Sequence, residues 1–203
     1  MSDILALDPA RTDNAKLMAD CATLGYLDGV VVDVTYNAGR FWREVRPPGM
    51  MRFDIDPQWG VRIADFCHLP LTDASISTVV LDPPYKLNGT STGKGPAALD
   101  EGYGVGGGYR SVTDIHEMIV DGIDEAWRVL VVGGFLLLKC QAQQNAGRMN
   151  DQPAIFSTYA VNSGRWTDVD RLHVISTPRK QPRAQRTARS NISTLVVLKK
   201  RRP

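Results

Sequence analysis

The 203-residue chain is poor in the residues that build disulfide frameworks and metal centres. It has three cysteines and three histidines, and neither set shows the paired spacing of a zinc site. Cys21, Cys67 and Cys140 lie far apart in the sequence, so we expect reduced thiols rather than disulfide bonds. The sequence therefore predicts a protein without a bound metal.

Long apolar runs are missing as well. No run comes near the roughly 18 apolar residues that span a bilayer, and the N-terminus lacks a basic segment followed by an apolar one. Hydrophobic residues nevertheless make up 43% of the chain, enough for a buried core. We expect a single domain over residues 1–203, located in the cytoplasm and without membrane contact.

The net charge is only +2, but it is unevenly distributed along the chain. Residues 171–203 hold ten of the 24 basic residues and none of the 22 acidic ones. Basic side chains that neutralise phosphates release counterions, so a cationic end on an acidic body predicts binding to a polyanion such as nucleic acid. The alternative is an ordinary solvated segment.

The most informative motif is Leu-Asp-Pro-Pro-Tyr, which ends an apolar run at residues 81–85. Enzymes that act on an extruded base need hydrogen-bond acceptors for its amine and a flat surface for stacking. Asp82 and the Pro83 carbonyl can serve as acceptors, and Tyr85 can stack. Pro83 and Pro84 restrict the backbone and hold these groups in place. A strand followed by a simple proline turn is the alternative.

Two upstream segments have the pattern of a nucleotide-binding fold. An apolar run at residues 29–34 leads into a turn whose small residues let a ligand approach the backbone. Twenty-one positions after Asp33, a second apolar run ends at Asp54, with Asp56 close behind. A spacing of about 20 residues places a carboxylate on a ribose diol. Asp54 is therefore the ribose candidate, and Asp56 is the next.

Together these segments resemble the motifs of the amino-methylating DNA methyltransferases, the adenine-N6 and cytosine-N4 enzymes of the class I S-adenosylmethionine-dependent type. Residues 81–85 resemble motif IV, the DPPY motif; residues 29–40 resemble motif I and residues 63–70 resemble motif III. The resemblance implies S-adenosyl-L-methionine as the cofactor. The cofactor-binding residues that it implies are Asp33, Thr35, Asn37, Gly39, Asp54 and Asp65, and the catalytic ones are Asp82, Pro83, Pro84 and Tyr85.

The resemblance also implies a reaction, methyl transfer to the exocyclic amine of a base. Adenine N6 in DNA is favoured, because an acid at the first position of motif IV is commonest among adenine-N6 enzymes, whereas cytosine-N4 enzymes often have serine there. DNA cytosine-N4 and RNA guanine-N2 methyltransferases are alternatives, since the latter have a similar strand end. A non-catalytic nucleic-acid binder on the same scaffold is a further alternative.

The order of apolar runs predicts an α/β fold. Strands are expected at residues 29–34, 51–55, 77–81, 135–140, 172–175 and 194–198, and helices at 11–27, 41–45 and 113–131. This alternation indicates a Rossmann-like, mostly parallel sheet with helices on both faces. The resemblance to class I methyltransferases adds a C-terminal antiparallel strand. A third strand is expected at residues 61–63, and residues 56–60 are too few for a helix between it and the strand at 51–55.

Two features of the loops bear on ligand binding. Asn37 stands where the family has a second glycine, and asparagine tolerates the positive φ of such a turn. The expected loops are a Gly-rich substrate loop at 86–112, a polar loop or insertion at 141–165 whose amides read base edges or are solvated, and a basic loop at 177–192. The expected phosphate contacts are Lys86, Lys94, Arg110, Arg179, Arg183, Arg186 and Arg189.

Overall fold

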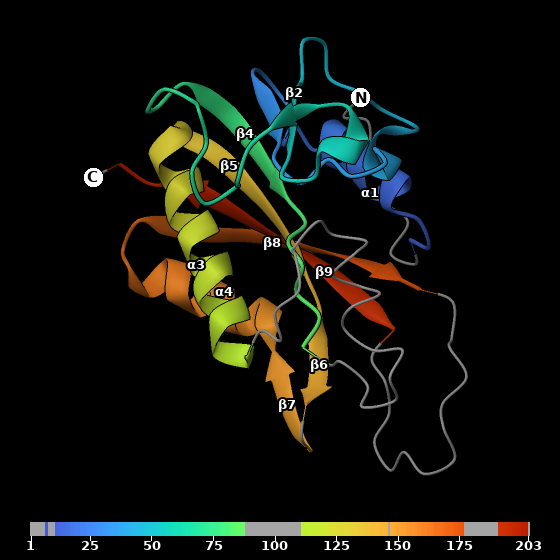
Figure 1. Cartoon of the computed structure of the whole chain (residues 1–203), viewed down its shortest axis with the longest axis vertical. Coiled ribbons are helices and arrows are strands. Elements are labelled where there is room, and N and C mark those ends of the chain that lie inside the picture. The colour runs from blue at the N-terminus through green and yellow to red at the C-terminus, as the bar shows by residue number, and fades with distance from the viewer. Residues whose placement is uncertain (1–6, 8–10, 88–110, 146, 177–190, 203) are drawn as a thin grey trace, which may run out of the picture.

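The computed structural model, which describes residues 7, 11–87, 111–145, 147–176 and 191–202, is built around one seven-stranded sheet (Figure 1). The strand order is β3-β2-β1-β4-β5-β9-β8. Neighbours from β3 to β5 pair in parallel, and β9 is antiparallel to both β5 and β8. The predicted mostly parallel sheet with a C-terminal antiparallel strand is confirmed. The strands are β1 (Val31–Asp33), β2 (Met51–Asp54), β3 (Arg62–Ile63), β4 (Ile76–Leu81), β5 (Leu130–Cys140), β8 (Trp166–Ile175) and β9 (Ile192–Lys200).

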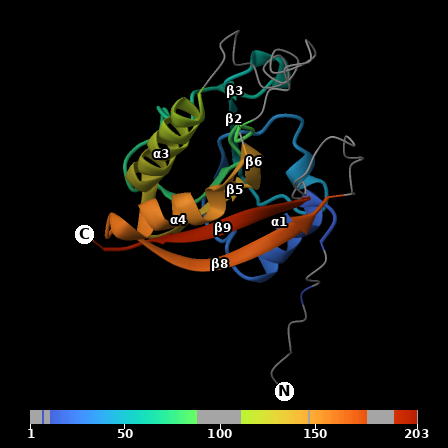
Figure 2. The ribbon, with the colours of Figure 1, turned by 90° about the horizontal axis from the view of Figure 1, so that it is seen from below.

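Alternating side chains of the central strands divide the core into two clusters. Successive residues of a strand point to opposite faces, so one cluster takes Val79 and Leu81 while the other takes Val80. The first cluster packs under α3 (Val112–Val129) and α4 (Gln152–Asn162), and the second packs under α1 (Asn14–Thr23). Figure 2 shows these helices on opposite sides of the sheet. Helices on both faces were predicted, and this prediction is confirmed.

The helices begin where the sequence supplies caps. The Asp13 side chain accepts a hydrogen bond from the Ala15 N–H at the start of α1. Ser111 and Asp114 form a capping box at the start of α3, in which each side chain accepts from the other residue's backbone N–H. Both helices lie where the sequence predicts them, although α1 is shorter than the expected 11–27.

The predicted helix at residues 41–45 is wrong. The structure has only a 3-10 turn, η1 (Arg40–Trp42), because Pro47 and Pro48 follow too closely for an α-helix to develop. Between β2 and β3 lies another 3-10 turn, η2 (Pro57–Trp59), in agreement with the expectation that no α-helix fits there. Beyond β3, residues 64–75 cross to β4 without a helix.

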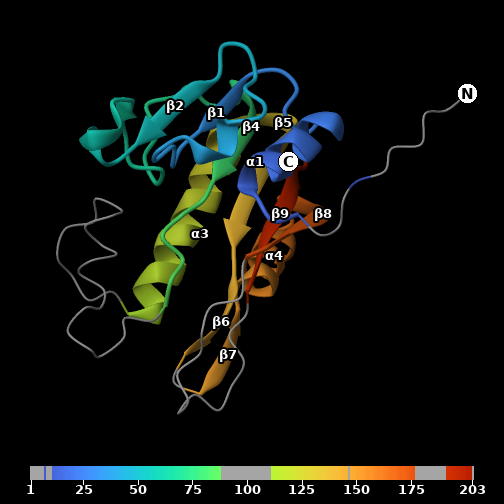
Figure 3. The same ribbon diagram turned by 90° about the vertical axis from the view of Figure 1, so that its right-hand side faces the viewer.

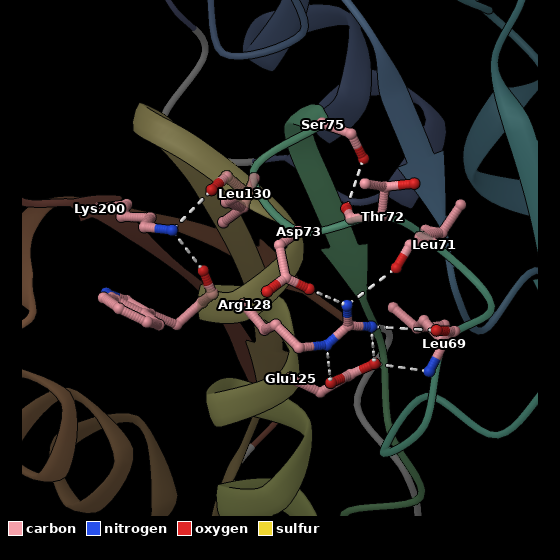
Figure 4. Close-up of polar contacts among 10 residues, drawn as sticks. Leu69, Leu71, Thr72, Asp73, Ser75, Glu125, Arg128, Leu130 and Lys200 are labelled. Atoms are coloured by element: carbon pink, nitrogen blue, oxygen red, sulfur yellow. Dashed lines mark hydrogen bonds and ion pairs between the residues drawn. The ribbon is translucent and has the colours of Figure 1, made fainter.

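Arg128, near the end of α3, stabilises the segment of residues 64–75 through hydrogen bonds to its backbone (Figure 4). Its guanidinium donates to the Leu71 carbonyl at 2.8 Å and to the Leu69 carbonyl at 3.0 Å. The same group donates to Glu125, whose Oε1 accepts from the Leu69 N–H at 2.6 Å. One side chain thus satisfies two backbone carbonyls of a segment that forms neither a helix nor a strand.

Replacement of Arg128 by alanine is expected to lower the free energy of unfolding by about 2–4 kcal/mol, because charge-assisted bonds to backbone carbonyls are lost together. Asp73→Ala is the matched control. It removes only an ion pair of Arg128 whose acid is 74% exposed, so it should cost about 0–1 kcal/mol. Urea unfolding of both variants measures the difference, and equal losses would contradict this role of the backbone contacts.

Residues 141–165, expected to be a polar loop or an insertion, contain regular secondary structure. The segment forms a hairpin of β6 (Ala142–Asn145) and β7 (Arg148–Asp151), followed by α4. Asp151 caps α4, Pro153 occupies its first turn, and Phe156 and Ala160 are buried one helical turn apart. Other apolar residues of α4, such as Ile155 and Val161, are exposed, so the sequence shows no single apolar face there. Figure 3 shows that the hairpin projects away from the sheet.

The described part of the chain has neither a membrane-spanning helix nor a metal site. No helix there is long and apolar enough to cross a bilayer. Nor do three or more metal-ligating side chains come together anywhere in those residues. Most of the predicted Gly-rich loop, residues 88–110, and most of the predicted basic loop, residues 177–190, lie outside the described residues.

Candidate cofactor and substrate site

The segments that the sequence singled out meet at one point of the sheet. Strand order reverses between β1 and β4, since β2 and β3 extend to one side and β5 to the other. Asp33 at the end of β1 lies opposite Val80 of β4, so the turn after β1 and residues 82–85 leave the sheet at the same edge. Ligands of open α/β sheets bind outside the carboxyl ends of the strands at such a switch point.

Thr35 joins the two segments directly. Its hydroxyl oxygen accepts a hydrogen bond from the Asp82 N–H at 2.7 Å. Backbone bonds from the Val34 N–H to the Val80 carbonyl and from the Tyr36 N–H to the Phe53 carbonyl continue the connection to β4 and β2. Thr35 therefore fixes the position of the proline motif relative to the turn after β1.

Asp33 stabilises this turn through hydrogen bonds to its carboxylate. Its carboxylate is buried and accepts from the Trp42 indole N–H at 2.6 Å and from the Thr35 N–H at 3.0 Å. Burial raises the pKa of Asp33 to about 7, the hydrogen bonds oppose that rise, and the nearby Asp82 and Asp54 carboxylates add to it. The described contacts give Asp33 a structural role, and its contact with a cofactor stays a prediction.

Asp54 and Asn37 shape the rest of the turn. Asp54 accepts from the Asn37 N–H at 2.7 Å and from the Asp56 N–H at 3.0 Å. Asn37 has φ 49° and Gly39 has φ 65°, both in the left-handed region. The conformation expected of Asn37 is thus the one it adopts. Each Asp54 oxygen keeps acceptor capacity, which suits a ribose hydroxyl.

Asp65 lies apart from this arrangement. Its carboxylate accepts from the Cys67 N–H at 2.9 Å and lies 4.0 Å from the His68 ring nitrogen. Among the described contacts, none links Asp65 to the turn after β1 or to Asp82. β3, which precedes Asp65, is separated from β1 by β2. The cofactor contact that the resemblance implies for Asp65 therefore stays a prediction.

Lys139 contacts Asp82 and was not predicted from the sequence as a residue of the site. Its ammonium lies 3.4 Å from Asp82 Oδ1 and 5.6 Å from the ring centroids of Phe41 and Tyr85. The residue is only 5% exposed, whereas the Asp82 side chain is 28% exposed. Burial raises the pKa of Asp82, and the Lys139 charge opposes that shift. A lysine inside the apolar run of β5 is the sequence signal that could have identified it.

Two glutamines form hydrogen bonds with the backbone of the proline motif at Tyr85. The Tyr85 carbonyl accepts from the Gln143 amide at 2.7 Å and from the fully buried Gln152 amide at 2.9 Å. The Pro83 carbonyl, predicted to accept from a substrate amine, already accepts from the Tyr85 N–H at 2.8 Å. Neither glutamine was expected to contact this motif. The result is a rigid loop in which Asp82 and Tyr85 have fixed positions.

Of the predicted phosphate contacts, Lys86 alone is described. It is exposed, directly follows Tyr85, and lies close enough for its charge to lower the pKa of Asp82. The others, Lys94, Arg110, Arg179, Arg183, Arg186 and Arg189, lie outside the described residues. Their contribution to binding stays a prediction.

Comparison with known proteins identifies the fold. No protein-family model and no curated protein sequence matches the chain. Solved structures do match, among them the N-methyltransferase NodS from Bradyrhizobium japonicum WM9, at 12% identity and TM-score 0.53, covering 92% of this chain and 96% of NodS. A SAM-dependent methyltransferase from Methanosarcina mazei gives 12% identity and TM-score 0.53, covering 90% of this chain and 98% of that one. The chain therefore has the Rossmann-like fold of class I methyltransferases.

Proposed function

We propose that this protein transfers a methyl group from S-adenosylmethionine to the exocyclic amine of a nucleic-acid base, with adenine N6 in DNA as the first choice. One observation carries the proposal. Asp82 and Tyr85 stand at the switch point of a methyltransferase fold, tied by Thr35 to the turn after β1. An acceptor and an aromatic ring thus lie beside the place where this fold binds its ligand.

The residues at the switch point fit the proposed cofactor. The turn with positive φ at Asn37 and Gly39 brings backbone close to a ligand, and Asp54 offers acceptors for ribose hydroxyls. NodS, which shares the fold, has been solved with S-adenosyl-L-homocysteine, at TM-score 0.51. When bound, S-adenosylmethionine supplies an activated methyl group on a sulfonium.

Methyl transfer to an amine requires the protein mainly to orient the amine toward the methyl group. The amine nitrogen forms its bond to the methyl carbon while the carbon–sulfur bond breaks and its electron pair remains on sulfur. Asp82 accepts a hydrogen bond from the amine and so directs the nitrogen lone pair toward the methyl group. The methylated ammonium then loses a proton to Asp82 or to water. Tyr85 holds the plane of the base by stacking.

The cationic end supports nucleic acid as the substrate. It supplies most of the expected phosphate contacts, and Lys86 extends positive charge to the rim of the site. Incubation with tritiated S-adenosylmethionine and separate DNA and RNA pools tests the assignment. Label in DNA is the expected result, label in RNA alone would favour the guanine-N2 alternative, and label in neither pool would contradict the proposal.

Replacement of Asp54 by alanine is expected to weaken S-adenosylmethionine binding by about ten- to a hundred-fold, because a charge-assisted bond to the ribose and the support of the Asn37 N–H are both lost. Titration calorimetry measures this effect. Asp56→Ala is the control, since that side chain accepts from the Gln58 N–H and caps η2. Equal affinities of the two variants would contradict the assignment of Asp54.

A further inference from the structure

The hairpin of β6 and β7 has no packing role that explains its presence. None of its strand residues is buried, and none belongs to either core cluster. A two-stranded hairpin is marginally stable by itself. This one is connected to the site by Gln143 and by Gln152 directly after it, both of which donate to the Tyr85 carbonyl. The hairpin is thus held in a fixed position beside the substrate residues.

The pairing register divides the hairpin into two faces. Residues directly opposite each other on antiparallel strands point to the same face, as do residues two apart. Gln143 pairs with Asn150, and Asn145 pairs with Arg148, so these four share the face from which Gln143 reaches Tyr85. The opposite face carries the pair of Gln144 and Met149.

The chemistry of the first face matches base edges. An arginine pairs in bidentate fashion with guanine, and an asparagine does so with adenine, in the major groove, which is wide enough for a two-stranded ribbon. The hairpin has one acid, Asp151, which belongs to the other face and is engaged in capping α4. No carboxylate therefore opposes a polyanion on the face with Asn145, Arg148 and Asn150.

We infer that the hairpin is a sequence-reading arm, which places Asn145, Arg148 and Asn150 in the major groove of duplex DNA beside the extruded base. This inference rests on the proposed function, for which it supplies the determinant of target sequence. It commits to DNA, because the deep and narrow major groove of A-form RNA does not admit such a ribbon.

The test compares Arg148→Ala and Asn150→Ala with Met149→Ala, a neighbouring residue that is 58% exposed on the other face. Each protein selects bound duplexes from a randomised DNA pool at fixed salt, and methylated positions are mapped in a second pool. Arg148→Ala should lose about five- to a hundred-fold of its preference at one flanking base pair. Asn150→Ala should lose preference at another, and Met149→Ala should keep the wild-type preference.

Several outcomes would overturn the inference. Unchanged preferences in both face variants would do so, as would equal losses in Met149→Ala. A weakening that is uniform across sequences, with a salt slope lower by about one, would mean that Arg148 contacts phosphate instead. If the wild type selects duplex sequences but transfers no methyl group, the proposed function is contradicted. The effects of the variants on duplex selection then still test whether the hairpin reads sequence. Selection of RNA alone, or of no nucleic acid, would contradict the inference that the hairpin reads DNA sequence.

Discussion

Replacement of Asp82 by alanine is expected to lower single-turnover methyl transfer by about a hundred-fold or more, while S-adenosylmethionine affinity stays within about threefold of the wild type. The side chain orients the substrate amine, and its loss leaves the nitrogen lone pair misdirected. Cofactor affinity should survive, because the backbone N–H of residue 82, which bonds to Thr35, is retained in the variant. Calorimetry and rapid-quench methylation of the best DNA substrate measure the two quantities separately.

A second variant separates chemistry from folding. Asp82→Ala leaves Lys139 buried without its partner, which is strongly destabilising in itself. The double variant Asp82→Ala with Lys139→Met removes both charges and keeps an apolar stem in place of lysine. It should regain stability but not methyl transfer. Wild-type transfer rates in a folded double variant would show that Asp82 is only part of a proline-rich strand end.

Lys139→Met alone is expected to lower the free energy of unfolding by about 3–5 kcal/mol at neutral pH, because it leaves the Asp82 carboxylate without its counterion. The loss should depend on pH. Burial already raises the pKa of Asp82, and removal of Lys139 raises it further. The folded variant then holds a proton that the unfolded chain has released, so its stability falls as pH rises from about 4 toward the raised pKa.

Urea unfolding at pH 5 and pH 8 measures this dependence. The deficit of Lys139→Met relative to wild type should be smaller at the lower pH, because the raised pKa lets more of the Asp82 carboxyl be protonated there. Lys199→Met is the control, since Lys199 is an exposed lysine of the neighbouring strand β9 and should change stability by no more than about 0.5 kcal/mol. A deficit that is equal at both pH values, or larger at pH 5, would contradict the role of the ion pair.

The sheet was predictable because its central strands are continuous apolar runs. Segments such as 78–81 and 136–138 are buried on both faces, as parallel strands covered by helices are. The hairpin and α4 were not predictable in this way. The apolar residues of α4 are spread around the helix and give no amphipathic pattern. The hairpin is stabilised by its own ladder and by amide contacts to Tyr85, which leave no periodic signal.

The candidate site was predictable only where its residues are adjacent in sequence. The turn after β1 and the proline motif each form a local pattern, and parallel pairing of β1 with β4 brings them together. Lys139 and the two glutamines come from segments more than 50 residues beyond Asp82 and Tyr85, and their contacts depend on strand register. A local pattern does not show which residues of segments this far apart in the sequence come into contact.

The most direct test of the central claim is nucleoside mass spectrometry after incubation of the wild type with methyl-labelled S-adenosylmethionine and duplex DNA or RNA. The predicted result is labelled N6-methyldeoxyadenosine from DNA, absent with the double variant Asp82→Ala and Lys139→Met. Label on a ring carbon of a base, or no labelled nucleoside from either pool with a protein that binds the cofactor, would contradict the assignment of this chain as a methyltransferase of base amines.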